Sequence, residues 1–228
     1  MKIGILQTGH APEALRGAFG DYPTMFARLL DGHGFDFQAW PVVDGRFPAS
    51  VHDADGWLLT GSRHGVYDEA PFIPPLMDFI RTACAQGVPL VGICFGHQAI
   101  AKALGAEVAK APGGWEVGAR RYDFEGRPLR LNAWHQDQVL SLPPGAEVVA
   151  SHPACPFAAL RYGDRAFSVQ AHPEFSDGFI EGLIDTRAPG VVPDDRREAA
   201  RASLGQGTDA AEVAARIAAF FKQPRGGQ

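Results

Sequence analysis

The stretch VPLVGICFGHQAIAKAL, residues 88–104, contains the feature that decides the fold. The apolar run of residues 88–94 predicts a buried strand, and the pattern of residues 96–105 predicts a helix. The two segments meet at Cys94, which lies between Gly92 and Gly96. A strand that turns sharply into a helix needs small flanking residues, because neighbouring strands leave no room for side chains there. The stretch therefore predicts a nucleophile elbow with a thiol at its tip.

The rest of the chain extends this strand–helix alternation. Strands are predicted at residues 2–8, 35–43, 54–62 and 88–94, and helices at 24–34, 72–87 and 96–105. Continuously apolar strands that alternate with helices indicate a parallel sheet covered on both faces. After residue 106, short strands separated by Gly, Pro and Asp predict a β-rich second half, and helical patterns return at 174–187 and 209–222. We expect a single domain over residues 1–228, with a C-terminal helical extension over about 188–228.

Composition excludes several classes of protein. The 228 residues are 46% hydrophobic and 21% charged, with a net charge of −5, which is ordinary for a globular protein. This mildly acidic net charge does not favour binding to nucleic acid or to an anionic membrane. No apolar run is long enough to span a bilayer. The N-terminus reads as a first strand and lacks the pattern of a signal peptide. We expect a soluble, cytoplasmic protein.

The cysteine pattern points away from disulfides and metals. The three cysteines, at positions 84, 94 and 155, are odd in number and widely spaced, and none belongs to a Cys-x-x-Cys pair. No pair of histidines has metal-ligand spacing. We therefore predict no metal and no cofactor. A metal held by His172 and Glu174 is the least favoured alternative.

A second motif supplies the base that a thiol nucleophile needs. Among the eight histidines, His172 directly follows the predicted strand 165–171 and would reach the edge of the sheet where Cys94 lies, if the two strands are parallel. Pro173 favours extended backbone at His172, and in an extended segment residues i and i+2 point to the same side. Glu174 can therefore orient the His172 ring. The pattern predicts a Cys–His–Glu triad in which the helix N-terminus stabilises the thiolate.

The two motifs GICFGHQ (92–98) and QAHPEF (170–175), in this order, resemble the class I, or triad, glutamine amidotransferases. The glutaminase domain of GMP synthase is one member, and the resemblance covers roughly residues 40–185. It implies a flavodoxin-like three-layer sandwich. It also implies that Cys94 attacks a γ-glutamyl amide to form a thioester, while His172 acts as acid and base and Glu174 orients it.

The resemblance implies further site residues. The backbone N–H groups of Gly61 and Phe95 would form the oxyanion hole. Gln98 would help to hold the amino-acid end of the substrate, together with Trp134, His135 and Gln136 in a loop at 134–137.

The chain departs from the amidotransferase pattern in two places. The segment Thr60-Gly61-Ser62 stands where many members have Gly-Gly-Pro, and Trp134 replaces a residue that is often polar. The segment GSRH (61–64) together with GICFGHQ looks more like the stand-alone γ-glutamyl peptidases of the same superfamily. The sequence also lacks the phosphate-binding loops of a synthetase half. Either the chain supplies ammonia to a separate synthetase subunit, or it hydrolyses γ-glutamyl conjugates alone.

Two other readings stay open at the level of sequence. One is a catalytically silent regulatory subunit on the same fold. The other is a different elbow-cysteine enzyme that pairs its cysteine with a nearby acid instead of a distant His-Pro-Glu motif. The substrate in the main reading is a small γ-glutamyl compound.

Overall fold

The computed structural model describes residues 1–224; the last four residues of the predicted 188–228 extension lie outside the described residues. Nine of the described strands form one sheet in the order β2-β1-β3-β4-β11-β10-β9-β6-β7. The first five of these are parallel: β2 (Asp36–Trp40), β1 (Lys2–Leu6), β3 (Gly56–Leu59), β4 (Leu90–Ile93) and β11 (Ala166–Val169). This 2-1-3-4-5 order is that of a flavodoxin-like sheet, so the predicted fold class is confirmed.

The second half of the chain extends the sheet with antiparallel strands. These are β10 (Cys155–Tyr162), β9 (Glu147–His152), β6 (Glu116–Phe124) and β7 (Arg127–His135). A separate two-stranded sheet pairs β5 (Val108–Lys110) with β8 (Asp137–Val139). Tight turns such as the one at Gly126, with φ 86°, allow this meander.

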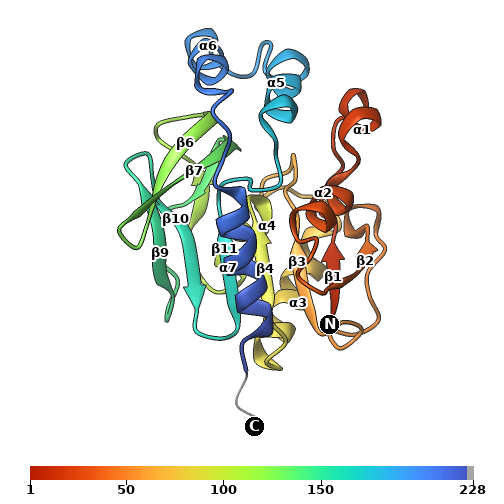
Figure 1. The fold of residues 1–228 in the computed structure, drawn as a ribbon. Helices are drawn as coiled ribbons and strands as arrows, with labels where there is room; N and C mark the ends of the chain where they lie inside the picture. Colours follow the sequence, from red (N-terminus) through yellow and green to blue (C-terminus); the bar gives the residue numbers. More distant parts are fainter. Residues whose placement is uncertain (225–228) are drawn as a thin grey trace.

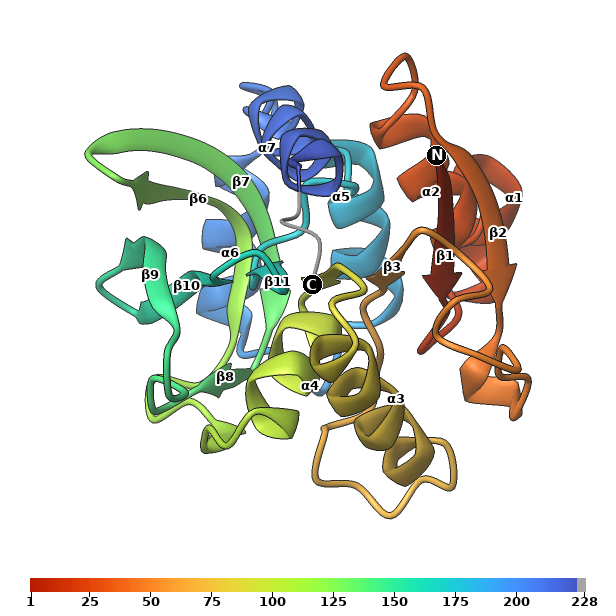
Figure 2. The ribbon, with the colours of Figure 1, turned by 90° about the horizontal axis from the view of Figure 1, so that it is seen from below.

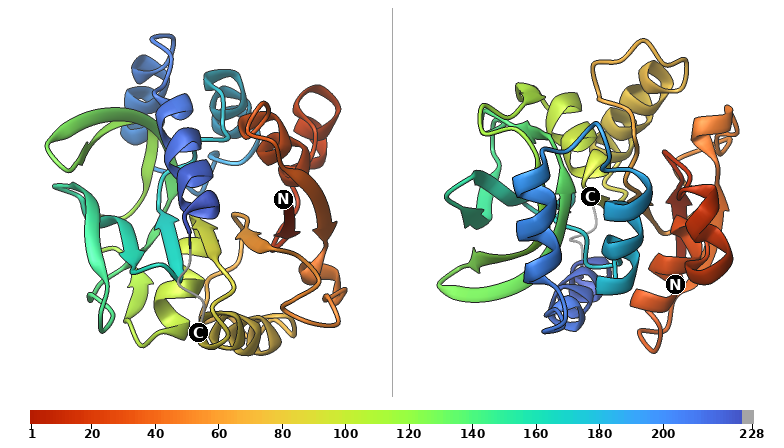
Figure 3. Two further views of the ribbon diagram at one scale, coloured as in Figure 1. Left: turned by 60° about the horizontal axis from the view of Figure 1, so that its bottom comes forward. Right: turned by 90° about the horizontal axis from the view of Figure 1, so that it is seen from above.

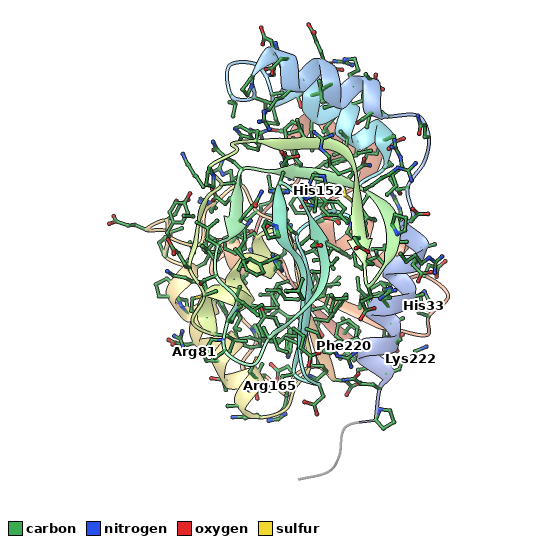
Figure 4. All side chains as sticks on the ribbon, turned by 90° about the vertical axis from the view of Figure 1, so that its left-hand side faces the viewer. His33, Arg81, His152, Arg165, Phe220 and Lys222 are labelled. Atoms are coloured by element: carbon green, nitrogen blue, oxygen red, sulfur yellow. The ribbon has the colours of Figure 1, made fainter. Side chains whose placement is uncertain are left out.

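Helices cover both faces of the sheet, which gives three layers. On one face lie α3 (Ile73–Ala85) and α4 (Phe95–Ala103), and on the other lie α2 (Tyr22–Leu29) and α7 (Ala210–Lys222) (Figure 2). Leu76 and Ile80 of α3 belong to the core on the first face. Phe26 of α2 and Ile217 of α7 belong to the core on the second. Figure 4 shows Phe220 of α7, whose ring centroid lies 6.1 Å from that of Phe167 on the sheet.

A third apolar cluster joins helices above the carboxyl ends of the parallel strands (Figure 1). It unites α1 (Glu13–Phe19), α5 (Asp177–Thr186) and α6 (Asp194–Ser203) through buried residues such as Leu15, Phe179 and Ala200. Seen from above, α5 lies between α6 and the α1–α2 pair (Figure 3). The carboxyl edge of an open α/β sheet is where such folds bind their ligands, and here it lies beneath a helical cap.

The predicted elements differ from the observed ones mainly in the short segments. The sequence patterns did not predict α1, β5 or β8, all of which are short. The polar helix α6 lies within the predicted helical extension of about 188–228, but no separate helix was predicted at its position. A three-residue 3₁₀ helix, Val42–Asp44, interrupts the end of the predicted strand 35–43. The division of the chain into one domain stays a prediction.

Candidate active site

Cys94 lies at the tip of the turn between β4 and α4. Its backbone has φ 52° and ψ −105°, a conformation that residues other than glycine rarely adopt and that is retained mainly at functional sites. A Cβ on Gly92 would lie 2.4 Å from the carbonyl oxygen of Gly96, and a Cβ on Gly96 would lie 2.5 Å from that of Leu59. Glycine is therefore required at both positions, and the close contact of α4 with the sheet holds the elbow in its strained shape.

His172 follows β11 and is fixed on three sides. Its backbone N–H donates to the carbonyl oxygen of Asn132 on β7 at 2.8 Å. Its ring stacks on Phe175, with centroids 4.0 Å apart and planes 4° from parallel. Its Nδ1 donates to Oε1 of Glu174 at 2.7 Å, and the carboxylate of Glu174 is fully buried. This arrangement leaves Nε2 as the nitrogen that can take part in chemistry.

Gly61, two residues after β3, lies beside both Cys94 and His172. A Cβ placed on Gly61 would be 3.1 Å from Cε1 of His172 and 3.8 Å from Cβ of Cys94. The ends of β3, β4 and β11 are adjacent in the sheet, and the N–H of Cys94 donates to the carbonyl oxygen of Val169 on β11 at 2.9 Å. Three segments far apart in the sequence therefore converge on one point at the carboxyl edge.

Two backbone N–H groups at this point have no acceptor. Within residues 1–224, neither Gly61 nor Phe95 donates its N–H to another residue. The carbonyl oxygen of Thr60 accepts from the N–H of Gly96 at 3.2 Å and from the hydroxyl of Thr8 at 2.9 Å. Because the peptide bond is trans, the N–H of Gly61 points away from these donors. The thiol therefore has two uncommitted hydrogen-bond donors nearby.

The charges around His172 favour its protonated form. Burial by itself lowers the pKa of the imidazole, but the negative charges of Cys94 and Glu174, and hydrogen bonding to both, outweigh burial and raise the pKa to about 10. Because Nδ1 is committed to Glu174, Nε2 is the ring nitrogen that interacts with Cys94, and it makes no well-aligned hydrogen bond to the described residues. An imidazolium at His172 is the state that these charges support at neutral pH.

The raised pKa of His172 gives a testable pH dependence. The stabilisation that comes from the charged ring is fully present below pH 6.5 and is lost as the pH rises through about 10, since the folded pKa lies above the ordinary value of 6.5. Cys94→Ala removes one of the charges responsible, so we expect the His172 titration to move to lower pH in that variant. Nuclear magnetic resonance of the ring protons would measure this shift. Identical titration curves in the two proteins would contradict the pairing.

The thiol opens into a cavity of about 510 Å³. Of the residues predicted from sequence, Cys94, His172 and those at positions 98 and 134–136 line it. Nε2 of Gln98 donates to the carbonyl oxygen of Asp137 at 2.9 Å, which ties α4 to the 134–137 loop. His135 is 4% exposed, and neither ring nitrogen makes a well-aligned hydrogen bond to the described residues. Burial lowers the pKa of His135 to about 3, with the charge of His172 as a smaller cause, so this ring is neutral at physiological pH.

Other residues that line the cavity were not predicted from the sequence. They include His10 in the loop after β1, Tyr22 at the start of α2, and Arg187 after α5. Tyr67 and Asp137 also line the cavity, and they belong to the segments 67–73 and 134–137, which the sequence had indicated. The loop after β1 could have been found, because parallel strands end at one edge of the sheet. The position of Arg187 had no sequence signal, because only the packing of α5 over the sheet brings it near.

Within residues 1–224, no group of three or more His, Cys, Asp or Glu side chains is arranged to hold a metal ion. None of the helices in that part of the chain combines the length and the apolar character needed to cross a membrane.

Comparison with known families identifies the chain. Residues 41–180 match the model of the family "Glutamine amidotransferase class-I". The chain belongs to the class I glutamine amidotransferase family. As a class I amidotransferase it resembles γ-glutamyl peptidase 4 of Arabidopsis thaliana, with 30% identity over 209 residues that cover 84% of this chain and 83% of the relative. It also resembles the glutamine-hydrolysing GMP synthase of Parafrankia sp., with 39% identity over 128 residues, which are 51% of this chain and 23% of that protein.

Solved structures show the same fold for this class I amidotransferase. A glutamine amidotransferase from Methylobacillus flagellatus has a TM-score of 0.78 at 24% identity, with 100% of this chain and 97% of that chain covered. One from Thermotoga maritima has a TM-score of 0.74 at 20% identity, with 97% and 96% covered. These similarities extend over the antiparallel half of the sheet and the helical cap as well as the flavodoxin-like core.

Proposed function

We propose that this chain is a thiol amidohydrolase that cleaves γ-glutamyl amides through a cysteinyl thioester, with Cys94, His172 and Glu174 as its triad. One observation carries the proposal. The strained thiol, the buried His–Glu pair and two N–H groups without acceptors meet at a single point of a 510 Å³ cavity. Membership of the class I amidotransferase family and similarity to γ-glutamyl peptidase 4 support the same chemistry.

In the first half of the reaction, the Cys94 thiolate attacks the γ-carbonyl carbon. The carbonyl oxygen becomes an oxyanion that accepts hydrogen bonds from the N–H groups of Gly61 and Phe95. The C–N bond then breaks as Nε2 of His172 gives its proton to the leaving nitrogen, which departs as ammonia or an amine. A thioester between Cys94 and the γ-glutamyl group remains.

In the second half, His172 takes a proton from water as that water attacks the thioester. The C–S bond breaks, glutamate leaves and the thiolate is restored. Glu174 stays ionised and holds the His172 ring with Nδ1–H directed toward it, so that Nε2 alone exchanges the proton. Gln98, Trp134, His135 and Gln136 contact the amino-acid end of the substrate in this proposal.

The same chemistry could serve two physiological functions: hydrolysis of γ-glutamyl conjugates, or supply of ammonia to a synthetase. Similarity to γ-glutamyl peptidases over most of the chain favours hydrolysis of γ-glutamyl conjugates by this protein alone. Transfer of ammonia to a separate synthetase subunit is the second candidate, because the chain also matches part of GMP synthase. The predicted cytoplasmic location remains a proposal.

The function is tested by incubating the purified chain with glutamine and a panel of γ-glutamyl dipeptides and measuring glutamate release. We expect release without any added protein, and labelling of Cys94 by a glutamine-like chloroketone detected by mass spectrometry. If no substrate yields glutamate and the chloroketone leaves Cys94 unmodified, the silent regulatory reading replaces this one. Glutamate release from glutamine only after a synthetase is added would favour the second candidate.

Replacement of Gly61 by alanine should lower kcat by about 10–10²-fold. The new Cβ would lie 3.1 Å from Cε1 of His172, so the ring or the peptide must shift, and displacements of this kind at a catalytic site have such effects. Steady-state hydrolysis measures the loss. Gly17→Ala is the matched control, because a Cβ at position 17 would meet no atom within 4 Å. Equal activity of the two variants would remove Gly61 from the site.

A further inference from the structure

The cavity continues past His172 toward the helical cap. The ring of Phe175, which stacks on His172, lies 6.0 Å from the ring of Tyr22 on α2. Leu183 of α5 lines the same part of the cavity. In the proposed reaction, His172 protonates the leaving nitrogen, so the group attached to that nitrogen has to lie on the side of the cavity that adjoins His172.

Two polar groups in this part of the cavity have no partner. The hydroxyl of Tyr22 and the guanidinium of Arg187 make no hydrogen bond or ion pair with residues 1–224, and both residues line the cavity. Both belong to the lining of one cavity. Burial and the charges of Glu174 and Cys94 raise the pKa of the Tyr22 hydroxyl, and the charge of Arg187 acts in the opposite direction. An unpaired guanidinium and an unpaired hydroxyl of residues 1–224 therefore line the same cavity, and the Tyr22 ring lies next to the Phe175 ring that stacks on His172.

The arginines of α6 are all engaged. Arg196 donates to the carbonyl oxygen of Gly113 at 2.7 Å, Arg197 pairs with Asp194, and Arg201 donates to Asp185 at 2.6 Å. These contacts hold α6 against the β5–β6 loop and α5. Arg187, at the C-terminal end of α5, uses only its backbone N–H, which donates to the carbonyl oxygen of Leu183 at 2.8 Å. Within residues 1–224 its guanidinium has no partner, and it lines the cavity. Arg16 of α1 also has no side-chain partner in that part of the chain, but it does not line the cavity.

The same cavity also has apolar walls. Trp115 and Trp134 lie with ring centroids 6.1 Å apart, and both line the cavity and pack against the cap cluster, as Tyr22 does. The cavity volume of about 510 Å³ lies in the range that encloses drug-sized ligands. Free glutamine, which releases only ammonia, would leave this part of the cavity empty.

We propose that Arg187 and Tyr22 bind the carboxylate of the leaving amino acid, so that γ-glutamyl dipeptides with an apolar second residue are the preferred substrates. The proposal rests on the proposed function and names its substrate class. A guanidinium binds a carboxylate through two parallel N–H donors, and the Tyr22 hydroxyl adds a third donor. Trp115 contacts the side chain of the leaving residue.

The test compares γ-glutamyl-phenylalanine with γ-glutamyl-phenylalaninamide, which differ only in the terminal carboxylate. We expect the wild-type protein to have a kcat/KM about 10–100-fold higher for the acid, the range of a charge-assisted interaction. Arg187→Gln should bring the ratio of kcat/KM for the acid to kcat/KM for the amide close to one. Hydrolysis of the amide and of glutamine should stay unchanged. Tyr22→Phe should reduce the ratio by a smaller factor.

Two further variants make the result specific to Arg187. Lys110→Gln removes another positive charge from the cavity wall and should preserve the acid-to-amide ratio. Arg187→Lys keeps the charge at the helix end but loses the two-donor geometry, so it should show an intermediate ratio. It also serves as the test variant if Arg187→Gln does not fold, which circular dichroism will reveal.

The outcomes separate this inference from the proposed function. Hydrolysis of acid and amide at equal rates, or a ratio unaffected by Arg187→Gln, would overturn the carboxylate subsite and leave the triad intact. An acid-to-amide ratio near one in Lys110→Gln would also overturn the inference, because the carboxylate would then bind at Lys110. Failure to hydrolyse any γ-glutamyl compound would overturn both.

Discussion

Replacing Cys94 with alanine is expected to lower kcat for γ-glutamyl hydrolysis by about 10⁴–10⁶-fold, the range found when one member of a catalytic triad is removed. No other side chain can form the thioester, since His172 and Glu174 carry no nucleophile of comparable reactivity. The N–H groups of Gly61 and Phe95 remain, so the site should still bind substrate. Single-turnover measurements and intact-protein mass spectrometry would show that no acyl intermediate accumulates.

The same variant should keep its fold. Alanine removes only the thiol from a side chain that is 6% exposed, and the backbone conformation at position 94 is unchanged. We expect the free energy of unfolding to change by about 1 kcal/mol or less. Cys84→Ala is the control for loss of a buried thiol away from the cavity, and it should retain full activity. Near-normal turnover by Cys94→Ala would contradict the mechanism outright.

Replacing His172 with alanine should lower kcat by about 10²–10⁴-fold through loss of the general acid and base. The loss should depend on the leaving group, because a weakly basic amine departs without protonation. We therefore expect a smaller loss for a γ-glutamyl anilide that carries electron-withdrawing groups than for a γ-glutamyl alkylamide. Equal losses for the two substrates would assign His172 a purely structural role.

His172→Ala also has a structural cost that Cys94→Ala lacks. The carboxylate of Glu174 is fully buried and would lose its partner, and breaking such a pair costs about 3–5 kcal/mol. Thermal unfolding should therefore show a clear loss of stability, and activity must be measured well below the new midpoint. His52→Ala is the control, because His52 precedes β3 and lies at the opposite edge of the sheet. Unchanged activity in His172→Ala would favour the reading in which Cys94 works with a nearby acid.

The strained elbow could be predicted because its requirements are local. Gly92, Cys94 and Gly96 are close in the chain, and the change from an apolar run to a helical pattern shows where the backbone must turn. The pairing of His172 with Glu174 was predicted for the same reason, since the two side chains are two residues apart in an extended segment. Phe95 follows Cys94 directly and needed no further information.

The leaving-group side of the cavity could not be predicted in this way. Tyr22 and Arg187 are separated by most of the chain. In the local sequence, Tyr22 looks like an ordinary helical residue and Arg187 like an ordinary residue at the end of a helix. The packing of α2 and α5 brings both residues to the same cavity. The sequence does not predict this packing, because the apolar face of a helix can pack against many apolar surfaces with similar free energy. The polar helix α6 also gave no strong pattern, although its arginines anchor the cap.

The amino-acid sequence by itself determined the order of strands and helices, the position of the thiol at a sharp turn, and the histidine and glutamate that accompany it. Hydrophobic periodicity and backbone restrictions act over a few residues, so they can be read directly from the chain. Only the tertiary structure decided which segments meet around the thiol. It places Gly61 within contact distance of Cys94 and His172 and, in the part of the chain that the structure describes, leaves two N–H groups without acceptors and Arg187 without a side-chain partner. Those contacts depend on the packing of whole layers, because long-range contacts are selected by the complementary shapes of buried surfaces.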